Sequence, residues 1–252
     1  MSPPLLAALE EGVLTLTLNR PQKRNALDGA TLEALGEQLE RADLDAAVRV
    51  VALRGAGKDF CAGADLEELL ASAQRTVEEN EQAALRLGGI FLRMRELPKP
   101  VVAVVHGRAL AGGAGLATAC DLVLAAASAQ IGYPEIQRGF VPAMVLTMLR
   151  RQVGEKLAFD LAAAGRVLAA PEAAGLGLIS RAIPDPSFEA EVVGVLRGLA
   201  RTSASALALT KRQLYRLDGL PFDEGIRLGA QVNAVARAHP EFRAAIAAFL
   251  KH

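Results

Sequence analysis

Tryptophan, abundant cysteine and an excess of either charge are what this sequence lacks. Its 252 residues include no tryptophan, two cysteines and three histidines, and 28 basic residues balance 28 acidic ones. Cys61 and Cys120 match no disulfide framework or metal-ligand spacing, so we interpret both as small buried hydrophobes. The scattered histidines likewise predict no metal site. The absence of net charge argues against nucleic acid as a partner.

Long hydrophobic runs are also missing. The most apolar stretch, residues 110–120, contains three glycines and stops at Asp121, short of the ~20 residues that a membrane-spanning helix needs. The first residues lack the basic segment and apolar run of a secretory signal. We therefore expect no membrane association and a cytoplasmic location.

Alternating strand and helix patterns dominate most of the chain, in which 52% of the residues are hydrophobic. Residues 13–18, VLTLTL, alternate as a half-buried strand does, and residues 101–105, VVAVV, form the continuous apolar run of a strand buried on both faces. Residues 28–44 have helical spacing, with their leucines on one face. Strands that alternate with helices predict an α/β core.

The remaining segments fit the same plan, and the C-terminal part is helical with breaks near Ser203 and near residues 219–221 and 239–240. We predict a core with the functional site over residues 1–190 and a helical region over residues 191–252, whose surplus of apolar side chains favours contact between copies of the chain. Further strands are expected at residues 48–53, 121–125, 130–132 and 179–183, and further helices at residues 65–70, 78–97, 112–119, 142–153, 155–164 and 171–175.

Two glycine-rich stretches carry the strongest chemical signal. Residues 60–66, FCAGADL, and residues 109–116, ALAGGAGL, each follow a strand-like run and lead into a helix-like pattern. That arrangement aims backbone N–H groups from two helix starts at one point, which suits a developing oxyanion. Glu135 follows soon after, and a lone carboxylate beside two oxyanion donors predicts enolate chemistry on an activated carbonyl.

These segments resemble the crotonase superfamily, the family of enoyl-CoA hydratases and isomerases. The resemblance includes LTLNRP at residues 16–21, RNAL at residues 24–27 and KPVVA at residues 99–103. It continues with ACD at residues 119–121 and GL at residues 175–176. Many matches in the same order, over about two-thirds of the chain, are far more specific than any one of them alone.

The resemblance implies a fold, an assembly and a substrate class. The expected fold is a spiral of ββα turns with a helical C-terminal region, assembled as a homotrimer or a dimer of trimers. The substrate is an acyl-CoA, so CoA enters as part of the substrate, and no separate cofactor or metal is expected. Two peptide N–H groups form the oxyanion hole of such proteins, and the matching residues here are Ala64 and Gly112. Their small side chains let a thioester approach, and the helix start at Gly112 adds a partial positive charge.

CoA contacts are implied for two further segments. By the same resemblance, the segment that contains Arg24 and Ala26 lies along the nucleotide and the pantetheine of CoA. Arg24 is expected to meet a phosphate as a charge-assisted pair. The backbone around Ala62, Asp65 and Leu66 is expected to frame the adenine and the pantetheine arm.

One of the two acids used by many hydratases of this kind is missing. The first acid stands three residues after the oxyanion glycine and the second stands twenty residues further on; these positions are Gly115 and Glu135 here. A single acid meets the minimal need of a Δ3,Δ2-enoyl-CoA isomerase, which moves a proton from C2 to C4, and it also permits hydration through one group. The loops look more like hydratases of the methylglutaconyl-CoA type, which act on branched substrates, so hydration is the first expectation.

Further hypotheses stay open. Loss of the first acid also fits a non-catalytic member that only binds CoA esters. Two acidic pairs near the expected cleft, Glu67-Glu68 and Glu78-Glu79, are candidate replacements for that acid. The segment GAGK at residues 55–58 leaves a nucleotide-binding oxidoreductase as an alternative. The glycine spacings of the phosphate loop and of the Rossmann motif are both absent.

Glu135 needs a raised pKa to exchange protons near neutral pH. An apolar pocket raises the pKa of a carboxyl by desolvation. Tyr133, Ile136, Phe140 and Val141 are the residues expected to form that pocket.

Overall fold

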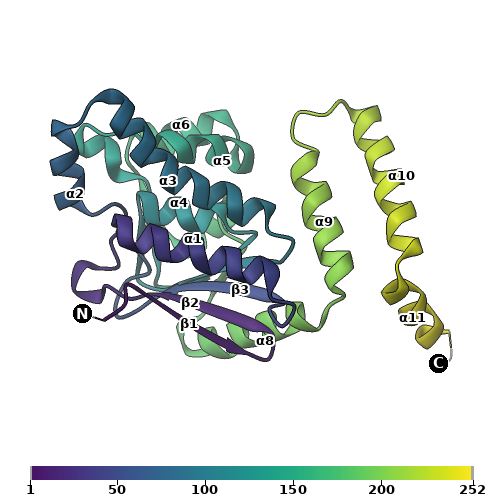
Figure 1. Cartoon of the computed structure of the whole chain (residues 1–252). Coiled ribbons are helices and arrows are strands. Elements are labelled where there is room, and N and C mark those ends of the chain that lie inside the picture. Colours follow the sequence, from purple (N-terminus) through teal and green to yellow (C-terminus); the bar gives the residue numbers. More distant parts are fainter. Residues whose placement is uncertain (1, 251–252) are drawn as a thin grey trace.

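The computed structural model describes residues 2–250 and contains two β-sheets surrounded by helices (Figure 1). The larger sheet has six strands in the order β1-β2-β3-β4-β6-β9. β1 and β2 pair as an antiparallel hairpin, and the later neighbours all pair in parallel. Parallel neighbours require crossover connections, which helices provide. The strands are β1 (Leu5–Glu10), β2 (Val13–Leu18), β3 (Val50–Gly55), β4 (Val101–Val105), β6 (Leu122–Ala126) and β9 (Arg181–Ile183).

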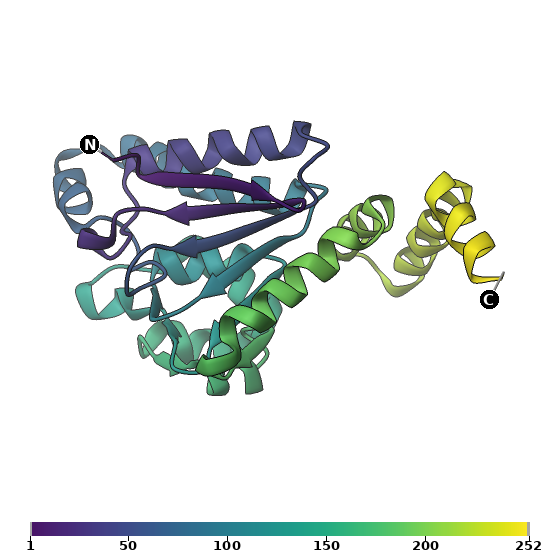
Figure 2. The same ribbon diagram turned by 90° about the horizontal axis from the view of Figure 1, so that it is seen from below.

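The centre of this sheet is formed by β3 and β4, and their sequences explain why. Every residue of β4 is buried, as are five of the six residues of β3. A strand covered on both faces selects a continuous apolar run, because neither face meets water. The hairpin strand β1 lies at the edge, and only Leu5 is buried in it. The helices α1 and α8 lie on opposite faces of the sheet (Figures 1 and 2).

Helix boundaries follow local capping signals. Asp28 precedes α1 and its carboxylate accepts a hydrogen bond from the Thr31 N–H, while Thr76 precedes α3 and forms a reciprocal capping box with Glu79. Such caps satisfy the N–H groups that a helix start leaves free. The core helices are α1 (Gly29–Leu44), α2 (Leu66–Ala71), α3 (Val77–Glu96), α4 (Gly112–Ala119), α5 (Ala143–Val153), α6 (Glu155–Ala163), α7 (Ala170–Gly175) and α8 (Phe188–Arg201).

A smaller sheet lies beside the first and carries the second glycine-rich stretch. Its strands are β5 (Arg108–Leu110), β7 (Gln130–Gly132) and β8 (Val167–Ala169), in that order. β5 pairs in parallel with β7, and β7 pairs antiparallel to β8. Because β5 leads directly into α4 and β7 leads into the segment of Glu135, this pairing brings the helix start and the acid toward each other. Four short 3-10 helices complete the described elements: η1 (Pro21–Lys23), η2 (Ser72–Gln74), η3 (Pro134–Arg138) and η4 (Asp185–Ser187).

The chain ends in an extended arm, which we call the C-terminal arm and which consists of α9 (Ala204–Arg216), α10 (Phe222–Ala238) and α11 (Pro240–Phe249). Figure 2 shows α10 and α11 reaching away from the sheets. Lys211 is the single buried residue of α9, and neither α10 nor the described part of α11 buries any residue. The arm is therefore attached to the core through α9, while α10 packs on α9 and α11 packs on α10.

A buried charge network attaches α9 to the core. The Lys211 ammonium donates to the Met94 carbonyl and to Asp121 Oδ2, both at 2.7 Å. Asp121 Oδ1 accepts from the Tyr215 hydroxyl at 2.6 Å, and the Arg95 guanidinium stacks over the Tyr215 ring. Burial lowers the pKa of Lys211, and the charge of Asp121 counters part of that effect. Pairing of this kind is what allows a lysine to be buried.

Most expected elements are present, and the α/β class is confirmed. The structure adds three strands that the patterns did not predict: β1, β5 and β8. The expected boundary between residues 190 and 191 falls within α8, whose buried face packs on the sheet, whereas the projecting part begins after the break at residues 202–203.

Among residues 2–250, no single helix is both long and apolar enough to cross a bilayer. The segments Asp185–Arg201 and Ala204–Arg216 reach that length only together, and a 101° bend separates them.

Candidate active site

The two glycine-rich stretches run side by side. The Phe60 N–H donates to the His106 carbonyl at 3.0 Å, and the Cys61 N–H donates to the Arg108 carbonyl at 3.0 Å. The Leu110 N–H returns a bond to the Cys61 carbonyl at 2.9 Å, which makes Cys61 and Ala109 bridge partners. This short parallel ladder fixes the register in which the two stretches approach the site.

A salt bridge reinforces the ladder at its start. The Asp59 carboxylate accepts hydrogen bonds from the Arg108 N–H and side chain at 3.0–3.2 Å. Burial alone raises the pKa of Asp59, but Arg108 outweighs it, so the carboxyl pKa lies below its ordinary value. Gly107 leaves no room for a side chain, because a Cβ there would lie 1.9 Å from the Lys58 carbonyl oxygen.

The Ala64 amide points away from the strand pairing that holds it. Ala64 is the bridge partner of Leu27, whose N–H and carbonyl bond to Gly63 and Asp65 at 2.8 and 2.9 Å. In a parallel bridge these bonds use the neighbours of Ala64, so its own N–H faces the opposite side. Among residues 2–250, no backbone carbonyl accepts from Ala64 or Gly112.

The amides of Ala64 and Gly112 lie close together. A Cβ built on Gly63 would lie 3.2 Å from the Gly112 nitrogen and 2.9 Å from the Ala111 Cβ. A Cβ built on Gly112 would lie 3.7 Å from the Ala64 nitrogen. The two glycine-rich stretches therefore meet at these amides, glycine at position 63 is required by this close approach, and the joint action of the amides as an oxyanion hole stays a prediction.

Ala111 holds the start of α4 in an unusual conformation. Its backbone has φ 52° and ψ −125°, a region that L-residues with a side chain rarely adopt. The Ala111 N–H donates to the Gly132 carbonyl at 2.9 Å, at the end of β7. Backbone strain of this kind costs ~1–3 kcal/mol and clusters at functional sites.

Glu135 is buried beside α4 in η3. Glu135 is 9% exposed, and its Oε2 atom has no hydrogen-bond partner within the described residues. Burial raises the pKa of Glu135, and a backbone hydrogen bond offsets part of that rise. The neighbouring Tyr133 is fully buried, and its hydroxyl lies 2.6 Å from Thr118 Oγ1 on α4. Tyr133 and the bond from Ala111 to Gly132 therefore hold the segment of Glu135 against the helix that starts at Gly112.

The expected pocket around Glu135 differs from the structure. Tyr133 is buried as expected, but Ile136, Phe140 and Val141 are 41%, 47% and 56% exposed. These three follow Glu135 along an exposed turn, and that part of the prediction is wrong.

Apolar side chains fill the position of the missing acid. A Cβ on Gly115 would lie 2.8 Å from Val145 Cγ2 and 3.1 Å from Phe91 Cζ. A glutamate at position 115 would require both of these side chains to move. Apolar side chains occupy the space, so Glu135 has no partner carboxylate at this position.

The acidic pairs that were candidate replacements are exposed. Glu67 pairs with Lys23, and Glu68 accepts from the Gly29 N–H at 3.2–3.3 Å. Glu79 belongs to the capping box of α3, and Glu78 precedes it on the same exposed turn. None of the four is a second buried acid like Glu135.

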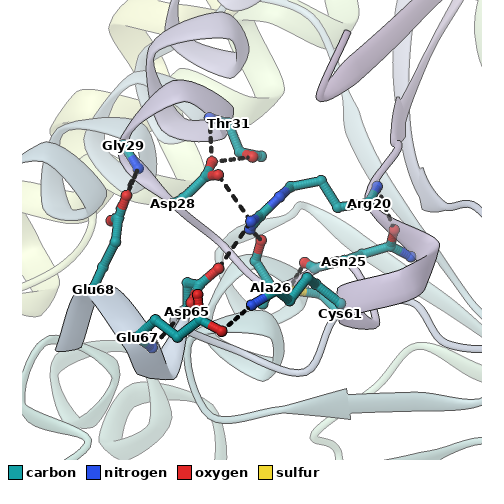
Figure 3. Close-up of polar contacts among 11 residues, drawn as sticks. Arg20, Asn25, Ala26, Asp28, Gly29, Thr31, Cys61, Asp65, Glu67 and Glu68 are labelled. Carbon is teal, nitrogen blue, oxygen red and sulfur yellow. Dashed lines mark hydrogen bonds and ion pairs between the residues drawn. The ribbon is translucent and has the colours of Figure 1, made fainter. Parts of the chain in front are cut away.

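The residues expected to contact CoA lie on two adjoining segments (Figure 3). The Ala62 N–H donates to the Arg24 carbonyl at 3.0 Å, and Arg24 has φ 52° in the left-handed region. The Arg24 side chain is 61% exposed, with its Nε 4.0 Å from Asp59. Ala26 and Asp65 are joined through Arg20, and Leu66 is exposed where α2 begins. Arg24 and Leu66 are exposed whereas Ala26 and Asp65 are buried, and the contacts of these residues with CoA stay a prediction.

Sequence reasoning assigned no role to two residues that organise these segments. Asn25 is 1% exposed, and its side chain bonds to the Arg20 N–H and to the carbonyls of Ala56 and Asp59 at 2.8–3.0 Å. The Arg20 side chain contacts Ala26, Asp28 and Asp65, which lie on two segments. Asn25 and Arg20 belong to the quoted motifs LNRP and RNAL, which was the available signal, but their partners lie far along the chain.

Two grooves lie away from these residues. One of about 560 Å³ runs between the main sheet and α8, and another of about 300 Å³ lies between the end of α3 and α9. Neither is lined by Ala64, Gly112 or Glu135. Ala64 is exposed and Gly112 is half-buried.

Comparison with known proteins decides between the families that this geometry allows. A family model described as enoyl-CoA hydratase/isomerase matches residues 8–252. The chain belongs to the enoyl-CoA hydratase/isomerase family. It is 40% identical over 247 residues to a Thermus thermophilus protein named as an enoyl-CoA hydratase, which covers 98% of each chain. It is also 31% identical over 248 residues to the 1,2-epoxyphenylacetyl-CoA isomerase of Escherichia coli, covering 98% of this chain and 95% of that one.

Solved structures of this family have the same fold. The enoyl-CoA hydratase of Mycobacterium smegmatis superposes with a TM-score of 0.94 at 34% identity, over 99% of this chain and 97% of that one. The crotonase-like fold with a helical C-terminal region is thereby confirmed. The protein is an enzyme of the enoyl-CoA hydratase/isomerase family, and hydratase names dominate among its relatives. The nucleotide-binding oxidoreductase hypothesis is excluded by this membership.

Proposed function

We propose that this enzyme adds water to a 2-enoyl-CoA through a thioester enolate, with branched acyl groups among its substrates. The Ala64 and Gly112 amides bind the thioester oxygen as it gains negative charge. Glu135 takes a proton from water while the water oxygen bonds to C3, and the same carboxyl returns that proton to C2. The Glu135 carboxyl therefore ends the cycle in the protonation state in which it began. No cofactor beyond the CoA of the substrate is needed.

The observation that supports this proposal most strongly is the state of Glu135. A carboxyl that is 9% exposed, with a raised pKa and one oxygen without a partner among the described residues, holds its proton to higher pH than an exposed carboxyl, as an acid–base group requires. The two amides nearby supply the other half of the chemistry, because preorganised N–H donors are typically worth ~2.7–4 kcal/mol each to the barrier.

Isomerisation of a 3-enoyl-CoA is the second candidate. Val145 and Phe91 fill the position of the first acid, and a single carboxyl suffices to move a proton from C2 to C4. A CoA-ester binder without activity is the alternative of another class, and the same loss at Gly115 motivates it.

A panel of 2-enoyl- and 3-enoyl-CoAs assayed in deuterated water distinguishes the three. Hydration places deuterium at C2 together with net addition of water, whereas isomerisation places label at C2 or C4 without addition. Binding of the thioesters without turnover of any panel member would support the non-catalytic alternative.

The Glu135→Gln variant tests the assigned acid. We expect acyl-CoA affinity within a few fold of wild type and turnover reduced at least ~100-fold, the usual scale for an acid–base group. The control Glu33→Gln changes an exposed carboxylate on α1 and should turn over like wild type. Near-wild-type turnover of Glu135→Gln would remove this residue from the mechanism.

We further propose that the protein acts in the cytoplasm as a homotrimer or a dimer of trimers. The exposed apolar side chains of the C-terminal arm support self-association, since a stable soluble monomer seldom exposes so many in one region.

A further inference from the structure

Arg20 contacts three residues on two segments of the candidate active site (Figure 3). Its Nη1 donates to the Ala26 carbonyl at 2.7 Å, and its Nη2 donates to Asp65 Oδ2 at 2.8 Å. The same Nη2 lies 3.1 Å from Asp28 Oδ2. The Arg20 side chain is 17% exposed, so these contacts are largely shielded from water.

These contacts flank the pairing that orients the Ala64 amide. Leu27 and Ala64 are bridge partners, Ala26 directly precedes Leu27, and Asp65 directly follows Ala64. One guanidinium therefore holds both chain segments within one residue of the bridge. Any loosening of the Ala26–Arg20–Asp65 connection lets the two segments separate and turns the Ala64 N–H.

We propose that Arg20 is a positioning residue for the oxyanion hole, which it serves by holding Ala26 and Asp65 on either side of the Leu27–Ala64 bridge. The inference rests on the proposed function of the Ala64 amide. Arg20 acts through these residues and touches neither the thioester nor Glu135.

Arginine suits this role for a geometric reason. Its planar guanidinium presents separate N–H groups to a carbonyl and a carboxylate at once, whereas the lysine ammonium is a single point charge. Because the donors are fixed in one plane, the distance between Ala26 and Asp65 is fixed as well.

The two carboxylates around Arg20 provide a matched pair of variants. Asp65 caps α2 through the Glu67 N–H, and Asp28 caps α1 through the Thr31 N–H. Asparagine caps a helix about as well as aspartate does, so Asp65→Asn and Asp28→Asn each keep the cap and lose one charge beside Arg20. Only Asp65 adjoins Ala64.

The test uses a readout that global stability does not change. A 2-enoyl-CoA carrying an electron-rich aromatic ring absorbs at longer wavelength when hydrogen bonds polarise its carbonyl, so the red shift of the bound probe reports the oxyanion hole. Turnover on the best substrate of the panel is measured in parallel, with kcat and KM separated, and circular dichroism establishes that each variant is folded.

For Arg20→Lys and Asp65→Asn we expect a smaller red shift and a kcat about 10- to 100-fold lower with KM within ~3-fold, because ~1 Å of misplacement costs up to ~100-fold. Asp28→Asn should lose less of both than Asp65→Asn, because Asp28 adjoins Leu27 rather than Ala64 itself. The control Arg93→Lys should keep the wild-type shift and kcat, since Arg93 likewise bridges a carbonyl and a carboxylate, those of Gly36 and Glu40, but between α1 and α3.

Full red shift and wild-type kcat in folded Arg20→Lys or Asp65→Asn would overturn the inference, as would equal losses in Asp65→Asn and Asp28→Asn. If Arg20→Lys does not fold, the comparison of Asp65→Asn with Asp28→Asn tests the inference by itself. A wild-type protein that binds the probe without any red shift would instead refute the oxyanion hole itself, and the inference with it.

Discussion

At the scale of single residues, a carboxyl buried for chemistry destabilises the protein that carries it. Glu135 is buried, and its Oε2 atom has no partner within the described residues. Its folded-state pKa is raised by burial, so the native state disfavours the charged form. The destabilisation is therefore absent at pH below the unfolded value of about 4.3, grows as pH rises toward the folded pKa, and is complete above it.

This sign leads to a prediction for Glu135→Gln. The free energy of unfolding of the variant minus that of wild type should increase by ~1 kcal/mol from about pH 4.5 to about pH 8. The reason is that wild type must bury a charge at high pH and the variant has none. Urea denaturation at several pH values measures the difference, with Glu33→Gln as the exposed control. A constant difference across this range would mean that burial does not perturb Glu135.

Single residues could be singled out where one short segment carried the signal. The glycine-rich stretches and Glu135 had their own sequence signature, and the family resemblance pointed to Ala64 and Gly112. The structure brings these two amides close together and buries Glu135, and the catalytic roles of all three stay predictions. The contacts of Arg20 and the filling of the space beside Gly115 by Val145 were not predictable. Both depend on residues distant in sequence, and no local pattern encodes which side chains meet in the fold.

At the scale of elements, the start of α4 stores strain in one residue. Ala111 has a positive φ and a ψ of −125°, and its N–H is held by the Gly132 carbonyl. Glycine adopts this region without the Cβ penalty, so Ala111→Gly should stabilise the protein by ~1 kcal/mol. Thermal unfolding checks this, with Ala84→Gly on the exposed face of α3 expected to cost ~1 kcal/mol. A destabilised Ala111→Gly would show that the Ala111 methyl contact matters more than strain.

Elements were predictable in proportion to the length of their pattern. The alternation in β2, the apolar run of β4 and the helical spacing of α1 were all read correctly from the sequence. β5 and β8 have three residues each, too few to show a period of two, and the run LLAALE of β1 does not alternate in polarity. These short strands exist because the sheets pair them, and tertiary pairing leaves no local signal.

At the scale of the whole molecule, the C-terminal arm exposes large apolar side chains that other parts of the described chain do not cover. The side chains of Phe222, Ile226, Val235 and Phe242 are exposed to 86%, 61%, 56% and 42%. Such surfaces are covered when copies of a chain associate. Each Å² of apolar area that is removed from water stabilises the contact by ~25 cal/mol. The outer helices α10 and α11 thus fit the predicted homo-oligomer.

The double variant Phe222→Asp/Ile226→Asp should therefore dissociate the assembly. Light scattering after size exclusion should give three or six times the 26.4 kDa chain mass for wild type and a single chain mass for the variant. Leu44→Asp, at an exposed leucine ending α1, is the matched control and should leave the mass unchanged. A monomeric wild-type protein would remove the arm's proposed role.

The central claim is that a thioester carbonyl meets the Ala64 and Gly112 amides beside a single acid. A crystal structure of Glu135→Gln with a bound 2-enoyl-CoA measures this directly. We expect the carbonyl oxygen to accept from both amides at about 2.7–3.1 Å, with the side chain at position 135 directed at C2. A carbonyl oxygen bound by neither amide, or a side chain at position 135 turned away from the acyl group, would contradict the account.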